Sequence, residues 1–223
     1  MDSLDRRITR GNIWVLTALP GILKLAEFNE LEARILLARL FYNVWPRVPW
    51  VFSRLALHSA KRVGDILQAR MNHCTPRDYA VVGQIITDLE GFKTYPPGQL
   101  LTLYLAAESR LQDGDASVLR ASILIGKAEC FDATDDQAQA RTSIEQALDL
   151  YRTKSEAEPH PDWAIVLRRA GHLLITMLDF AQGRALLDEG VNVARKTDFI
   201  AEVRRAKMHR RKMDQWMIRR SNL

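Results

Sequence analysis

Apolar residues recur every three or four positions along most of this chain, the spacing of one buried face of an α-helix. Short polar residues that can accept hydrogen bonds from free backbone N–H groups stand just ahead of several of these runs. Four such helix starts are present: Asn29 with Glu32, Thr75 before Pro76, Thr134 with Gln137, and Asp179 with Gln182. Few stretches alternate between apolar and polar residues. The pattern therefore predicts an all-α protein.

Breaks containing proline or glycine divide this pattern into helices. They fall at 45–49, 95–98 and 113–115, and the polar segment 154–162 is a predicted loop. The predicted helices are 5–28, 29–43, 47–72, 75–92, 97–112, 116–132, 135–154, 162–177, 180–196 and 198–220. We divide the chain into an N-terminal helical region, 1–95, and a helical repeat region, 96–223.

Two helix pairs in the second region have small residues at corresponding positions. Stacked helix pairs need small side chains where two helices cross closely and bulky ones between them. The small residues are Ala128, Ala140 and Ala147 in the first pair, and Gly171, Gly183 and Gly190 in the second. The bulky residues are Phe131, Ile144, Leu167, Leu174, Phe180 and Leu187. The offset from Ala128 to Gly171 is 43 residues because a loop intervenes.

This arrangement resembles the tetratricopeptide repeat (TPR), in divergent form, over residues 121–199, with the following helix as a cap. Lys127 stands where that family prefers leucine, and a generic stack of helical hairpins is the alternative interpretation. The resemblance implies a solenoid with a concave groove, lined by the leading helices, that binds peptides or proteins. On this chain the implied groove residues are Arg120, Lys127, Arg168 and Arg169, which do not complete the carboxylate clamp of some family members.

Aromatic residues and arginines are concentrated in the N-terminal region. The double-proline elbow 44–52 carries more large apolar side chains than a loop normally exposes, and aromatics with arginine are enriched in interface cores. We predict that the elbow docks onto a partner protein through Trp45, Arg47, Trp50 and Phe52. Docking onto a membrane surface is the weaker alternative, because no lysine-rich amphipathic face accompanies the elbow.

The last predicted helix is amphipathic and basic. Its apolar residues Phe199, Val203 and Ala206 fall near helical spacing. Its cations are Arg204, Arg205, Lys207, Arg210, Arg211 and Lys212. Three interpretations stay open: a solvated capping face, contact with an acidic protein, or contact with the phosphates of a nucleic acid.

Composition narrows the class of protein. The 223 residues are 47% hydrophobic, enough for a sizeable core, and the net charge is +5. Cys74 and Cys130 lie far apart without a CxxC motif, which predicts a reducing, cytoplasmic setting, no leader peptide and no metal site. The longest uncharged N-terminal stretch, 11–23, is shorter than the roughly 20 residues that span a membrane.

Motifs for catalysis are missing from the sequence. Gly126 and Lys127 resemble the end of a phosphate-binding loop, but the first glycine and the following serine or threonine of that motif are missing. The five histidines are scattered along the chain. We therefore expect a non-catalytic adaptor or complex subunit, without cofactors, that binds partner proteins or a second copy. A regulator that contacts nucleic acid through the basic helix is the first alternative. A helical enzyme whose site forms only in three dimensions is the second.

Overall fold

The computed structural model describes residues 75–90, 96–112, 116–158 and 160–221, and the regular secondary structure of these residues is entirely helical. The described helices are α5 (Pro76–Glu90), α6 (Pro97–Glu108), α7 (Ser117–Asp132), α8 (Gln137–Lys154), α9 (Asp162–Thr176), α10 (Phe180–Lys196) and α11 (Ile200–Ser221). The all-α prediction is confirmed for this part of the chain. The helices predicted at 5–28, 29–43 and 47–72 lie outside the described residues. No described helix is long and apolar enough to cross a membrane.

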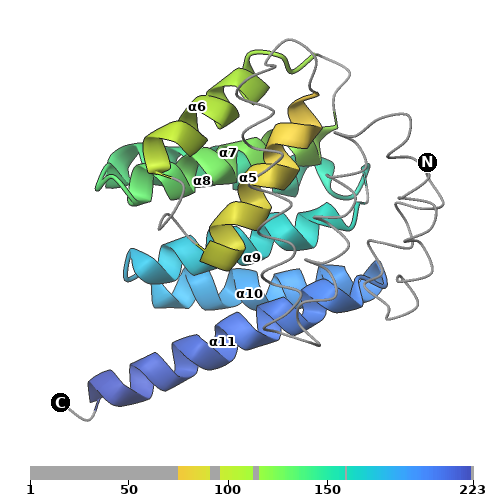
Figure 1. The fold of residues 1–223 in the computed structure, drawn as a ribbon. Coiled ribbons are helices and arrows are strands. Elements are labelled where there is room, and N and C mark those ends of the chain that lie inside the picture. Colours follow the sequence, from red (N-terminus) through yellow and green to blue (C-terminus); the bar gives the residue numbers. More distant parts are fainter. Residues whose placement is uncertain (1–74, 91–95, 113–115, 159, 222–223) are drawn as a thin grey trace, which may run out of the picture.

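Consecutive helices pack side by side as hairpins (Figure 1). The α7–α8 and α9–α10 pairs make the most extensive contacts, and α7 also packs on α9. At one end of this stack α5 and α6 pack on α7, and at the other end α11 packs on α10 and α9. The loop predicted at 154–162 separates the two hairpins, as expected.

The turns after α7, α9 and α10 share one backbone geometry. Each contains a residue with positive φ: Asp135 at 62°, Leu178 at 67° and Asp198 at 56°. The next N–H in each turn donates to the carbonyl five residues earlier, over 2.7 to 2.9 Å. This hydrogen bond ends one helix and sets the direction of the next.

Side-chain caps start three of the helices. Thr75 and Asp78 form a reciprocal capping box at α5, and Asp179 accepts a hydrogen bond from the Gln182 N–H, both as predicted. The third start differs, because Asp136 caps α8 by accepting from the Gln139 N–H. Thr134 instead donates to the Cys130 carbonyl and closes the end of α7.

The backbone of Leu178 is strained, because a leucine adopts a positive φ there. A left-handed backbone costs a side-chain-bearing residue about 1–2 kcal/mol, although asparagine and aspartate tolerate it better. Leu178 is 58% exposed, so little apolar packing is lost on its replacement. We expect Leu178→Asn to stabilise the protein by about 1 kcal/mol and to raise Tm by about 2–4 °C. Asp135→Asn, at the matching turn, should change Tm by much less; equal shifts in a thermal melt would contradict the prediction.

Small residues allow α9 and α10 to cross closely. A Cβ at Gly171 would lie 2.7 Å from the Gly183 carbonyl oxygen, and a Cβ at Gly183 would lie 2.7 Å from the Gly171 carbonyl oxygen. In the first hairpin Ala128, Ala140 and Ala147 are fully buried. The predicted close approach of two helices is thus present at Gly171 and Gly183, and the three alanines lie in the core.

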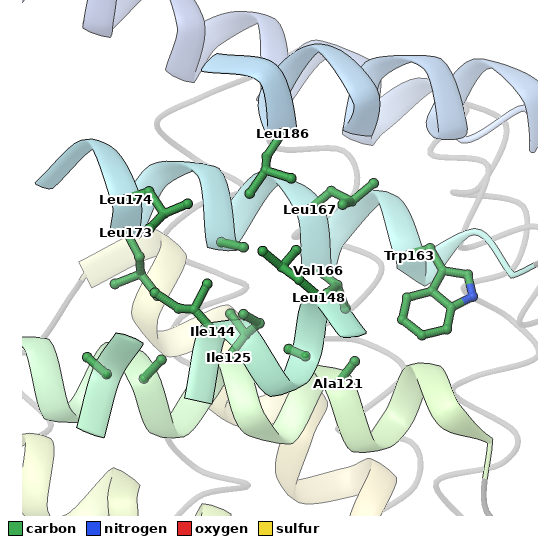
Figure 2. Packing of buried hydrophobic residues seen from close by; sticks show 14 of the residues in the cluster. Ala121, Ile125, Ile144, Leu148, Trp163, Val166, Leu167, Leu173, Leu174 and Leu186 are labelled. Carbon is green, nitrogen blue, oxygen red and sulfur yellow. The ribbon is translucent and has the colours of Figure 1, made fainter. Parts of the chain in front are cut away.

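The main core lies between the two hairpins, and Figure 2 shows its side chains from α7, α8, α9 and α10 meeting. Ile125, Ile144 and Leu167 are essentially inaccessible there. Trp163 closes one end of this core, with its indole N–H donating to the Glu158 carbonyl over 3.0 Å. A second apolar cluster, which includes Phe199, Val203 and Ala206, joins α11 to α9 and α10.

Candidate partner-binding groove

An open groove of about 460 Å³ lies between α6, α7 and α8. Its floor is apolar and is made by Leu111, Ile123, Leu124 and Leu150. Leu111 follows the end of α6, and the other three residues lie on α7 and α8. An apolar floor with a polar rim is the usual composition of a binding pocket.

The rim of the groove carries charges of both signs. Lys127 on α7 donates to both carboxylate oxygens of Glu108, at 2.8 and 2.9 Å. Arg120, two turns earlier on α7, donates to the Gln112 carbonyl at 2.5 Å and lines the groove. Asp149 on α8 lies at the opposite rim and is 71% exposed. Of the four predicted groove cations, Arg120 lines this groove and Lys127 is paired with its rim residue Glu108.

The other two predicted groove cations, Arg168 and Arg169 on α9, are only 1% exposed. Arg169 donates to both carboxylate oxygens of Glu129 on α7, at 2.5 and 2.8 Å, and also to the Tyr104 hydroxyl at 3.3 Å. Arg168 is ion-paired with Glu202 on α11. Both arginines thus link neighbouring helices inside the protein, which differs from the exposed position that the sequence analysis expects.

The basic residues of α11 divide into two groups. Arg204, Lys207 and Arg211 are exposed, whereas Arg205 is fully buried against Glu202 at 2.9 Å. Arg210 pairs with Asp188 on α10 at 2.6 Å. The side chain of Lys212 lies outside the described residues. Arg205 therefore does not belong to the expected basic face, because its side chain is buried and paired with Glu202.

The predicted elbow residues Trp45, Arg47, Trp50 and Phe52 lie outside the described part of the chain, so their docking role stays a prediction. Within that part the exposed large hydrophobic residues are Leu105, at 47%, and Leu178. Leu105 is on α6, and Leu178 is in the turn after α9.

The titratable groups with shifted pKa values are structural. Burial raises the pKa of the Tyr104 hydroxyl and that of the Cys130 thiol, so both stay protonated. Burial, together with a hydrogen bond donated to Glu189, raises the pKa of Tyr151. Burial also raises the pKa of Asp132. None of these groups lines the groove, and no cluster of three His, Cys, Asp or Glu side chains in the described residues has the arrangement of a metal site.

Sequence reasoning missed most of the groove and both buried acids. In the sequence, the floor residues Leu111, just after α6, and Leu150, on α8, look like ordinary core positions. Glu129 follows the buried Ile125 by four residues, so its place on the apolar stripe was the available signal for a buried acid. A buried carboxylate requires a cationic partner, which is Arg169 here.

Comparison of this chain with protein-family models, with curated proteins and with solved structures finds no match.

Proposed function

We propose that this protein is a non-catalytic adaptor, or a subunit of a larger assembly, that binds a partner protein on its stacked helical hairpins. The observation that carries the proposal is the groove between α6, α7 and α8, with its apolar floor and with Arg120 at its rim. The small residues at the helix crossings support a TPR-like stack, in which the leading helix of each hairpin contributes to a binding surface.

The groove fits a short segment of a partner protein. Its volume accommodates a few apolar side chains on Leu111, Leu124 and Leu150. Arg120 can pair with a carboxylate of that segment, because its planar guanidinium has donors beyond the one used by the Gln112 carbonyl. The expected partner is therefore an apolar segment that also carries an acidic residue. The N-terminal elbow is the proposed second attachment point.

Affinity purification of the tagged full-length chain from its own cells, followed by mass spectrometry, tests the proposal. We expect a stoichiometric partner protein, and we expect Leu111→Asp combined with Arg120→Glu to reduce its recovery at least tenfold. Leu111 is outside the main apolar core, so the variant should keep its melting temperature.

Arg141→Glu on the exposed side of α8 is the matched control and should retain the partner. Full recovery with the groove variant would exclude the groove as the binding site. Recovery of the chain without any stoichiometric partner would exclude the adaptor function.

A further inference from the structure

One face of α10 carries a row of two exposed arginines, Arg184 and Arg195, with Asp188 between them. Arg184, Asp188 and Arg195 are spaced four and seven residues apart, so they share one side of the helix. The ion pair between Asp188 and Arg210 turns this side toward α11. Both Arg184 and Arg195 are exposed, so they border the seam between the two helices.

A second row follows the exposed side of α11. Arg204, Lys207 and Arg211 are spaced three and four residues apart, and all three are exposed. The opposite side of this helix packs inside the protein through the buried pair Glu202 and Arg205, so the three cations face solvent. The two rows together place five exposed cations on adjacent helices.

Acidic residues do little to neutralise these cations. The Asp188 carboxylate is paired with Arg210, and Glu202 is buried between arginines. Glu189 accepts a hydrogen bond from Tyr151 of α8, which places it on another side of α10. Asp198 lies in the turn before α11, and Asp214 lies on α11 three residues beyond Arg211, so it can offset charge only at the C-terminal end of the exposed row. The middle of the α10–α11 surface is therefore positive.

The residues on this surface favour phosphate over protein as the ligand. Protein interfaces depend on large apolar and aromatic anchors, and the described exposed residues of α10 and α11 include none. Contacts to a phosphate backbone require only cations, and arginine is well suited to them. We propose that the α10–α11 surface binds the phosphate backbone of a nucleic acid without reading its sequence. It is distinct from the groove on α6, α7 and α8, so it does not depend on the proposed adaptor function (Figure 1).

Fluorescence anisotropy of the full-length protein with labelled duplex DNA, duplex RNA and single-stranded RNA of equal length tests this proposal. If each of the five cations neutralises one phosphate, the slope of log K against log salt concentration for duplex DNA should be about −4.5. The three probes show whether DNA or RNA is preferred. A fourth measurement uses labelled polyglutamate as a model of an acidic protein surface.

Charge reversal locates the binding surface. We expect Arg204→Glu, Lys207→Glu and Arg211→Glu together to weaken binding at least tenfold and to reduce the slope by about 2.7, since three phosphate contacts are lost. The matched control reverses three exposed cations of α8, namely Arg141, Arg152 and Lys154, and so changes the net charge equally. This control should retain most of the affinity and the slope.

A second variant keeps the test decisive if the triple variant fails to fold. Arg184→Glu with Arg195→Glu alters only α10 and should reduce the slope by about 1.8. The proposal is overturned by a slope near zero, by equal losses in the α8 control, or by binding to polyglutamate in place of all three nucleic acids. The last result would identify an acidic protein as the partner of this surface.

Discussion

Replacement of Gly126 by alanine should destabilise the protein by about 3 kcal/mol. A Cβ at Gly126 would lie 2.1 Å from Cζ of Tyr104, inside the aromatic ring. The ring cannot retreat, because a Cβ position at Gly83 on α5 is only 2.3 Å from the Tyr104 hydroxyl and the whole side chain is inaccessible to solvent. Overpacking of this kind typically costs about 1–3 kcal/mol. The free energy of unfolding from chemical denaturation measures the effect.

A loss of stability would be diagnostic of the clash with Tyr104, because alanine in place of glycine normally stabilises a helix by about 1 kcal/mol. Gly98 on α6 is the matched control, since no atom lies within 4 Å of its Cβ position, and Gly98→Ala should be neutral or mildly stabilising. In a Tyr104→Ala background the space opens, so Gly126→Ala should cease to destabilise. A loss that persists without the tyrosine ring would show that another contact limits the space at Gly126.

The sequence was sufficient for features that depend on local chemistry. Capping residues such as Asp179, and the polar segment 154–162, located helix boundaries because a helix end must satisfy its backbone groups nearby. Small residues at regular spacing, such as Gly171 and Gly183, indicated close helix crossings for a similar reason. The observed bounds of α5 to α11 differ from the predicted ones by at most a few residues.

Features that depend on contacts between distant segments could not be predicted. Gly83, Tyr104 and Gly126 meet only because three helices pack together, and no spacing along the chain connects them. Arg168 and Arg169 look like surface residues of a leading helix, but acids on α7 and α11 hold them inside. Arg120 lines the groove between α6, α7 and α8, and Lys127 pairs with its rim residue Glu108, but Glu108 and Asp149 come from other helices, so no spacing along the chain predicts this groove.

The largest expected effect of a charge change is at Glu202. Its carboxylate is fully buried between the guanidinium groups of Arg168 on α9 and Arg205 on α11, both of which are also buried. Glu202→Gln keeps the shape of the side chain but removes the negative charge that compensates two buried cations. Breaking a buried ion pair in this way typically costs about 3–5 kcal/mol. We expect a loss of that size in the free energy of unfolding, measured by urea denaturation at neutral pH.

The exposed ion pair at the same helix interface is the matched control. Asp188 and Arg210 also join α10 to α11, but their side chains are 44% and 41% exposed, so water solvates either charge when the other is removed. Asp188→Asn should therefore cost less than about 1 kcal/mol. Equal losses for the two variants would show that Glu202 acts through the α10–α11 contact in general. A much larger loss for Glu202→Gln would establish that the buried charge holds α11 against α9.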